Sequence, residues 1–297
     1  MHFSHRLLAA LLLLSGGLHF ASHAQADFTL IDNFESYGTG GPIHGQGAWQ
    51  AERTGDPVSA GVTVDPLNPT NHVMNIGDGG FVGGRLGHRE TINTDSALTI
   101  SQGSTATLFF RLACNTSEID LSVGMTDVAN PISDVIFNSF TQFESQLAIA
   151  FAPGFDKLGV RDVNGLKVLT TNVQPLEWYN VWMVIDNLAD TTQIYLQGGA
   201  FAASTLLDSG GQTSFAFRNG IAGNDLVTFF IATGRNTENL PPNPTENIGP
   251  VYFDDLYIDT TGVNLANPVP EPGSIVLGLL GASTLVITAF RRRRLRQ

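Results

Sequence analysis

The chain alternates between short apolar segments and polar breaks rich in Gly, Asn, Asp and Pro, and this pattern continues from residue 28 to residue 259. Side chains that alternate with a period of two, over runs of four to ten residues, are typical of strands in an antiparallel sheet. No helical periodicity extends beyond a turn or two. The predicted strands fall within 28–37, 60–65, 72–76, 97–100, 105–113, 119–125, 146–152, 166–171, 178–186, 192–196, 226–232 and 251–259.

A dozen strands at this spacing predict an all-β fold with two packed antiparallel sheets, either a sandwich or a jelly roll. No repeat of 20–50 residues is present, which disfavours propellers and solenoids. No linker divides the body, so we expect one domain over residues 27–262. The chain turns polar from Thr260 to Val269, which is expected to form a short stalk, and the C-terminal region with the stalk and the sorting segment covers 263–297.

The N-terminus has the pattern of a secretory signal peptide over residues 1–26. Arg6 precedes an apolar run from Leu7 to Leu14, and Ala24-Gln25-Ala26 forms a small-residue cleavage pattern before Asp27. The apolar run is too short to cross a bilayer, which disfavours a retained anchor. We therefore expect the body to be exported.

The C-terminus predicts a transmembrane helix. The 17 residues from Ser274 to Phe290 carry no charge, which is the lower limit for a membrane span. The arginines that follow are expected to stay on the cytoplasmic side. Both ends therefore predict the same topology, with the body outside the inner membrane.

The order of three features at this end closely resembles the PEP-CTERM sorting signal of Gram-negative bacteria. They are Pro270-Glu271-Pro272, the apolar helix, and the cluster Arg291, Arg292, Arg293 and Arg294. The resemblance implies an exosortase as partner, a membrane enzyme that processes the protein near the PEP motif. It also implies transfer to the cell envelope or outer surface, or secretion, in bacteria that make extracellular polysaccharide and biofilm matrix.

The charge of the chain argues against nucleic-acid binding, and its cysteine content argues against a disulfide framework and a cysteine nucleophile. The chain has a net charge of −12, although six of its 15 Lys and Arg residues lie in the two end segments, so the body is strongly acidic. Such a body would repel nucleic acid. Cys114 is the only cysteine, which excludes an intramolecular disulfide, and its apolar surroundings indicate a buried side chain rather than a nucleophile.

Three segments of the body resemble concanavalin A-like, laminin-G-type jelly rolls. Trp178–Gly199 is similar to their central hairpin, and Ile31–Gly41 and Val251–Thr260 are similar to their first and last strands. The resemblance implies two curved antiparallel sheets whose terminal strands lie near one another. It does not imply an activity, because this fold includes lectins, glycosidases, lyases and adhesion modules.

The candidate catalytic residues are Glu118 and Asp120. Their segment, Ser117–Gly124, resembles the E-x-D-x-E strand of glycoside hydrolases that share the fold. Glu118, Asp120 and Ser122 share a face at strand spacing. A retaining glycosidase needs a second carboxyl group ~5–5.5 Å from the nucleophile, but Ser122 stands near the position of that acid. Because this second carboxyl group is missing, the alternative of an ordinary strand with exposed acids is favoured.

Two binding sites are also candidates. A structural Ca²⁺ site, which the superfamily resemblance suggests, would use Asp32, Glu35, Asp254 and Asp255, because Ca²⁺ takes six to eight oxygen ligands. In a regular strand Asp254 and Asp255 face opposite ways, so only one is expected to contribute, and edge-strand acids that prevent aggregation are the alternative. For sugar stacking, Trp49 in a Gly-rich loop is the candidate that we expect to be exposed, whereas Trp178 and Trp182 are expected to be buried.

The sequence therefore favours an exported surface or matrix protein that binds or organises extracellular polysaccharide without catalysis. A polysaccharide-acting glycoside hydrolase that uses Glu118 and Asp120 is one alternative. A purely structural or adhesive envelope protein, whose partner is another protein, is the other.

Overall fold

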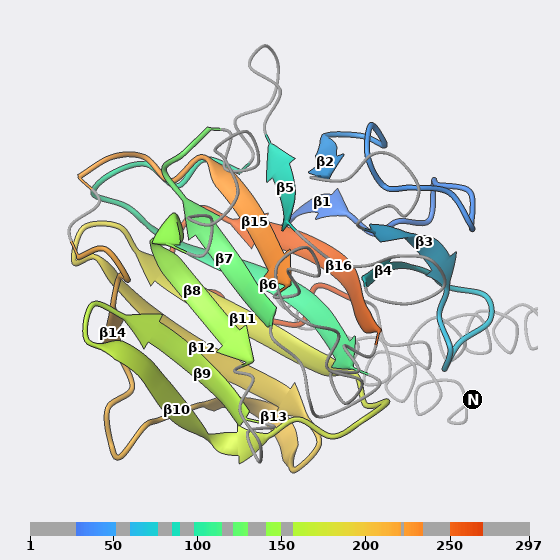
Figure 1. Ribbon diagram of the computed structural model, residues 1–297. Helices are drawn as coiled ribbons and strands as arrows, with labels where there is room; N and C mark the ends of the chain where they lie inside the picture. The colour runs from blue at the N-terminus through green and yellow to red at the C-terminus, as the bar shows by residue number, and fades with distance from the viewer. Residues whose placement is uncertain are drawn as a thin grey trace, which may run out of the picture.

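The computed structural model describes residues 28–51, 60–76, 85–89, 98–114, 121–129, 141–149, 157–220, 223–233 and 250–269. Within these ranges the chain forms sixteen strands in two antiparallel sheets and no helix, which confirms the predicted all-β fold (Figure 1). None of these residues forms a helix long and apolar enough to span a membrane. The expected span, Ser274–Phe290, and the signal peptide lie outside the described residues.

The larger sheet, sheet A, has nine strands, and its main path runs β13-β12-β11-β6-β16-β4-β3. Strand β1 pairs with β16 and strand β14 with β12 at the sides of this path. The strands are β1 (Thr29–Asp32), β3 (Ala60–Val64), β4 (His72–Ile76), β6 (Thr105–Cys114), β11 (Tyr179–Asp186), β12 (Thr191–Gly198), β13 (Phe201–Leu206), β14 (Phe215–Ala216) and β16 (Val251–Asp259).

The smaller sheet, sheet B, has seven strands in the order β10-β9-β8-β7-β15-β5-β2. Its strands are β2 (Trp49–Ala51), β5 (Arg85–Arg89), β7 (Leu121–Thr126), β8 (Ser145–Ile149), β9 (Lys157–Asp162), β10 (Gly165–Asn172) and β15 (Thr228–Thr233). Figure 1 shows this sheet in front of sheet A.

The expected pairings of the terminal and central strands are confirmed. Strand β1 pairs antiparallel with β16, so the first and last strands of the body are neighbours. Strands β11 and β12 form a regular hairpin, in which Asp186 stands opposite Thr191 and Asn180 opposite Gln197. Strand β11 also pairs with β6 along its whole length, which places this hairpin in the middle of sheet A.

The core lies between the two sheets and contains most of the large apolar side chains. Phe110 and Phe253 from sheet A stack with ring centroids 5.1 Å apart, and Phe229 from sheet B lies 5.6 Å from Phe253. Cys114 belongs to this core and is fully buried, as expected, and burial raises its thiol pKa to about 12. A thiol in that environment stays protonated and inert.

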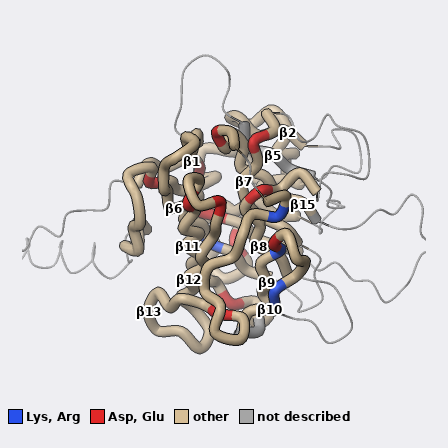
Figure 2. The backbone as a smooth tube through the Cα atoms, turned by 90° about the vertical axis from the view of Figure 1, so that its left-hand side faces the viewer, with Lys and Arg blue, Asp and Glu red and all other residues tan. Residues whose placement is uncertain are grey.

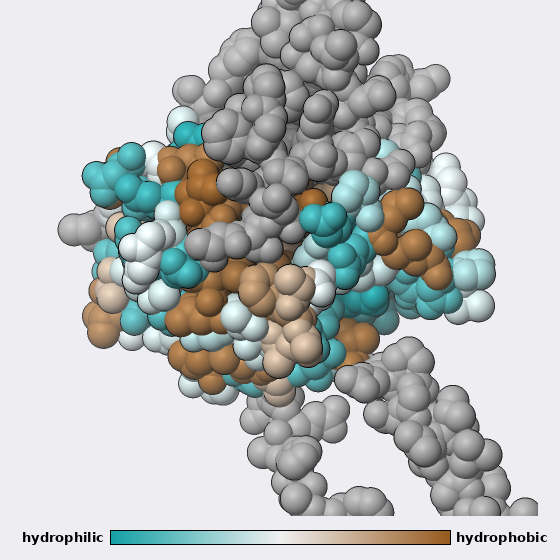
Figure 3. Space-filling model, turned by 90° about the horizontal axis from the view of Figure 1, so that it is seen from below, coloured by the Kyte–Doolittle hydropathy of each residue, from teal (hydrophilic) through white to brown (hydrophobic). Residues whose placement is uncertain are grey.

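Alternation along β6 gives sheet A a distinct outer face. Leu108, Phe110 and Leu112 belong to the core, so the residues between them, Phe109 and Arg111, lie on the opposite side of the sheet. The described surface mixes polar and apolar residues, and the view from below shows brown areas next to teal ones (Figure 3). Leu67 and Leu176 are among the exposed apolar side chains.

The segment that we expected to form a stalk instead contacts this outer face. Thr107 donates a hydrogen bond from Oγ1 to the Gly262 carbonyl (2.8 Å) and accepts one from the Asn264 amide (3.0 Å). Trp182 Nε1 donates to the Ala266 carbonyl (2.9 Å). We call residues 260–269 the strap, because they lie across the sheet rather than leading away from it.

Candidate functional site

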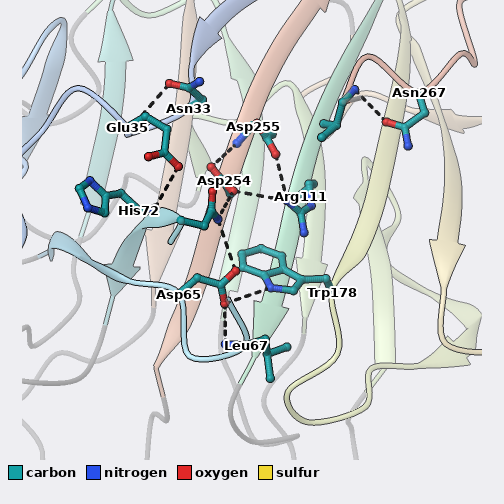
Figure 4. Close-up of polar contacts among 12 residues, drawn as sticks. Asn33, Glu35, Asp65, Leu67, His72, Arg111, Trp178, Asp254, Asp255 and Asn267 are labelled. Atoms are coloured by element: carbon teal, nitrogen blue, oxygen red, sulfur yellow. Dashed lines mark hydrogen bonds and ion pairs between the residues drawn. The ribbon is translucent and has the colours of Figure 1, made fainter. Parts of the chain in front are cut away.

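A charged cluster lies on the outer face of sheet A, at the junction of β6, β16 and the turn between β3 and β4. It consists of Arg111, Asp254, Asp255, Asp65, Asn71 and Trp178, and we call it the Arg111 cluster (Figure 4). Seen from the side, red acidic segments gather near β1 and β6 (Figure 2). Two of the predicted calcium ligands, Asp254 and Asp255, belong to this cluster.

A β-bulge brings the two neighbouring aspartates to the same arginine. The pairing of β16 with β6 is interrupted between Asp254 and Tyr257, and Asp255 has a φ of 54°. A bulge inserts an extra residue and turns its side chain away from the regular alternation. The expectation that Asp254 and Asp255 face opposite ways is therefore wrong, because both carboxylates contact Arg111.

The geometry of the ion pairs makes Arg111 the positive centre of the cluster. Its Nη1 lies 3.0 Å from Asp255 Oδ2 and 3.5 Å from Asp254 Oδ2. The side chain of Asp254 is only 1% exposed. Burial raises its pKa to about 8 and the charge of Asp255 adds to the rise, whereas Asn71 and Arg111 lower it. Arg111 therefore offsets part of the cost of burying two adjacent carboxylates.

Trp178 forms the aromatic part of the cluster. The Arg111 guanidinium carbon lies 4.6 Å from the centre of the Trp178 ring, within the range of a cation–π interaction. Trp178 Nε1 is 3.4 Å from Asp65 Oδ1, and Asn71 Nδ2 donates to both Asp65 (3.3 Å) and Asp254 (2.9 Å). Trp178 is only partly buried, contrary to our expectation, whereas Trp182 is buried as expected.

The four predicted calcium ligands do not come together as a metal cage. Asp32 accepts hydrogen bonds from the Phe34 amide, the Tyr37 hydroxyl and Trp49 Nε1, at 2.7–2.9 Å. Glu35 accepts one from the His72 amide, and the other two carboxylates face Arg111. No group of three or more His, Cys, Asp or Glu side chains among the described residues is placed to hold a metal ion. The arrangement does not fit Ca²⁺, because a guanidinium lies where a cation would bind.

Because these residues do not fit a Ca²⁺ site, the stability of the protein is not expected to depend on calcium. Removing divalent cations with EDTA is expected to leave the melting temperature of the protein unchanged, because a ligand stabilises a fold only if it binds the folded state. Differential scanning calorimetry with EDTA and with added CaCl₂ tests this. A melting temperature that falls in EDTA and recovers with Ca²⁺ would contradict this prediction and support a calcium site.

The structure does not support Trp49 as an exposed platform. Trp49 lies in strand β2 of sheet B, is fully buried, and donates its indole N–H to Asp32 at 2.7 Å. Its ring packs against Phe34 and Phe229 in the core, with centroids 5.7 and 6.4 Å away. The Gly-rich loop before Trp49 suggested exposure, but the ring turns inward, so it is not placed to stack on a ligand.

The candidate catalytic residues Glu118 and Asp120 lie just before strand β7 and outside the described residues. Ser122, two residues further along, is described. It is buried on the outer face of sheet B, where it accepts a hydrogen bond from Gln146 Nε2 at 2.6 Å. Gln146 in turn accepts one from Arg218 Nη1 at 2.8 Å. This strand position therefore contributes to a serine–amide–guanidinium network that sequence reasoning did not identify.

The residues of the sorting signal, Pro270, Glu271, Pro272 and Arg291 to Arg294, lie outside the described residues, but sequence comparison covers them. A family profile for the PEP-CTERM protein-sorting motif matches residues 268–294. No curated protein matches the chain.

Solved structures that are similar to the chain include lectins and glycoside hydrolases. Lectin II from Ulex europaeus aligns with a TM-score of 0.47 and 11% identity over 78% of this chain and 98% of that chain. The catalytic domain of the glycoside hydrolase family 131 protein from Coprinopsis cinerea aligns with a TM-score of 0.45 and 12% identity over 78% and 95%. The PL-14 alginate lyase from Aplysia kurodai aligns with a TM-score of 0.40 and 12% identity over 68% and 87%.

Fold and motif together give a coarse description of the protein. Its body has the two-sheet antiparallel architecture expected from the sequence. The chain carries a PEP-CTERM protein-sorting motif, which marks it as an exported protein that passes the membrane to be secreted or held at the surface.

Proposed function

We propose that this protein is a surface or matrix protein, sorted by an exosortase, whose body binds extracellular polysaccharide without cleaving it. The binding surface that we propose is the Arg111 cluster, with Trp178 as its aromatic platform. The observation that carries the proposal is the partly exposed Trp178 side chain. The Arg111 guanidinium lies over its ring, the Asp65 carboxylate lies at its indole N–H, and the Asn71 carboxamide bonds to that carboxylate.

These groups are chemically suited to a sugar. A pyranose ring has an apolar face, which packs on an aromatic ring, and a rim of hydroxyl groups, which need donors and acceptors. Arg111, whose side chain is 22% exposed, supplies donors for these hydroxyl groups. Asp65 is buried and accepts from the Leu67 amide, Asn71 and Trp178, so it holds the indole in position rather than contacting the sugar. Asn180, opposite Arg111 on β11, adds a second carboxamide, whose Nδ2 contacts Gln197 at 3.1 Å. Polar side chains therefore continue from the cluster across the outer face.

The sorting motif supports the compartment in this proposal. A PEP-CTERM motif on an acidic β-sandwich is consistent with delivery to an envelope rich in polysaccharide. We propose an exosortase and an extracellular polysaccharide as partners. Before processing, the C-terminal helix would anchor the protein in the inner membrane.

The replacement Trp178→Ala tests the binding surface. Because the apolar face of a sugar ring packs on an aromatic ring, the loss of Trp178 is expected to weaken polysaccharide binding about tenfold. Affinity electrophoresis in gels that contain the polysaccharide of the host measures the change. Leu188→Ala is the matched control, since Leu188 is a 75% exposed apolar residue at the β11–β12 turn.

The outcomes separate this proposal from the alternatives. Equal binding by Trp178→Ala and by the control would remove the Arg111 cluster as the site. Release of oligosaccharides from the polysaccharide, lost in Glu118→Gln, would favour a hydrolase. The absence of both binding and hydrolysis in the unmodified protein would favour a structural or adhesive role. Melting curves of each variant exclude unfolding as the cause.

A further inference from the structure

The strap is held on sheet A by two groups of contacts close to the sorting motif. The first is around Thr107, whose hydroxyl contacts both Gly262 and Asn264. The second is Trp182, whose indole N–H donates to the Ala266 carbonyl. Asp259, at the end of β16, adds hydrogen bonds from Thr261 and from Asn264 Nδ2. The last of these residues, Ala266, precedes Pro270 by only four positions.

An aromatic cluster on the outer face supports these contacts. Phe109 packs edge-on against Trp182, Tyr257 and Phe28, with ring centroids 5.1, 6.0 and 6.2 Å apart. Phe109 and Trp182 are almost completely buried, although they do not belong to the core between the sheets. Buried aromatic rings fix the indole N–H in position, so the Trp182 contact is a rigid attachment point.

The attachment sets the length of chain between the body and the motif. Four residues, from Ala266 to Pro270, reach at most about 14 Å when fully extended. If the strap were detached back to Asp259, eleven residues would be free and would reach about 38 Å. The docked strap thus keeps the motif close to the folded body, where a membrane enzyme has less room to reach it.

We propose that the strap restrains sorting: its docking on Thr107 and Trp182 shortens the free chain before the PEP segment, and undocking controls the rate of processing. This inference rests on the proposed sorting by an exosortase, and it adds that the folded body itself regulates that step. The processing enzyme must then capture the motif in the undocked state, whose population depends on the strap contacts.

The replacement Thr107→Val tests the restraint, because it preserves the shape of the side chain and removes two hydrogen bonds to the strap. Hydrogen exchange of the full-length protein should show an Asn264 amide that exchanges about tenfold faster in the variant. In the native host, the fraction of chains that retain Arg296, measured by mass spectrometry over time, should fall several-fold faster. Trp182→Phe, which keeps an aromatic ring and loses the N–H donor, should act in the same direction.

Thr205→Val is the matched control, since the Thr205 hydroxyl donates to the nearby Ala203 carbonyl on its own strand, β13. It should change neither measurement. Faster exchange with unchanged or slower processing would overturn the restraint, and so would an Asn264 amide that is unprotected in the unmodified protein. If the unmodified chain keeps Arg296 at all times, sorting by cleavage itself fails. The exchange data would then still show separately whether the strap is docked.

Discussion

Replacing Arg111 by alanine is expected to lower the free energy of unfolding by about 3–5 kcal/mol, the range measured when one partner of a buried ion pair is removed. Arg111 contacts the carboxylates of Asp254 and Asp255, and these side chains are only 1% and 12% exposed. Without the guanidinium, two adjacent carboxyl groups would remain in a poorly hydrated site with no positive partner. Chemical denaturation followed by intrinsic fluorescence measures the change.

Lys167→Ala is the control for this prediction. Lys167 lies 3.9 Å from Asp162 and is 30% exposed, so its loss should cost less than about 1 kcal/mol. Adding Asp254→Asn to the Arg111→Ala variant should recover part of the lost stability, because burial raises the pKa of Asp254, so the folded state must bind a proton there that an asparagine does not need. If Arg111→Ala and Lys167→Ala lowered the free energy of unfolding by the same small amount, the stability of the cluster would not depend on Arg111.

Replacing Gly124 by alanine is expected to destabilise the protein by at least about 3 kcal/mol. A Cβ atom at this position in β7 would lie 1.8 Å from the Ser145 carbonyl oxygen and 2.9 Å from its carbon. These are backbone atoms of the paired strand β8, so no side-chain rotation can relieve the clash and the two strands must separate locally. Thermal unfolding of the purified variant measures the loss.

Gly38→Ala serves as the comparison for Gly124→Ala. A Cβ at Gly38 has no heavy atom within 4 Å, and its backbone does not adopt a left-handed conformation, so the replacement should be close to neutral. If the melting temperature of Gly124→Ala lay within a degree or two of that of the unmodified protein, β7 and β8 would not approach as closely at Gly124 as the structure indicates.

Much of the fold could be predicted because strand alternation and sheet burial leave a direct trace in the sequence. The apolar positions of β6 and β11 alternate in register, and the polar turn between β11 and β12 is visible as Asp186 to Asp190. Strands β2, β5, β9, β13 and β14 were not predicted. Strands β2 and β14 are only three and two residues long, and β5 and β9 contain glycine and charged residues. Strand β13 is the edge strand of sheet A and has no buried residue, so it carries no apolar pattern.

The candidate site was harder to predict because it depends on single backbone irregularities. The sequence places Asp254 and Asp255 side by side but does not show that a left-handed φ at Asp255 turns both toward Arg111. Similarly, a Gly-rich loop does not reveal that Trp49 turns inward to reach Asp32, and a central hairpin does not reveal that Trp178 stays partly exposed. These outcomes depend on long-range contacts, which local patterns do not encode.

The strap shows the same limit at the end of the body. Its polar composition and Pro268 are typical of a linker, and only the positions of Thr107 and Trp182 on distant strands explain its docking. Asn264 and Ala266 are joined to residues more than 80 positions earlier in the chain. A reading of residues 260–269 alone therefore predicts a free stalk.

Polysaccharide binding by the unmodified protein is the central claim, and a glycan array tests it most directly. The full-length protein in detergent would be applied to a broad array that includes the exopolysaccharide of its host, with calcium and again with EDTA. We predict binding to polysaccharide of equal strength in both buffers, because Arg111 rather than a metal ion is the positive centre of the proposed site. No binding in either buffer would contradict the account and leave a structural envelope protein as the better description.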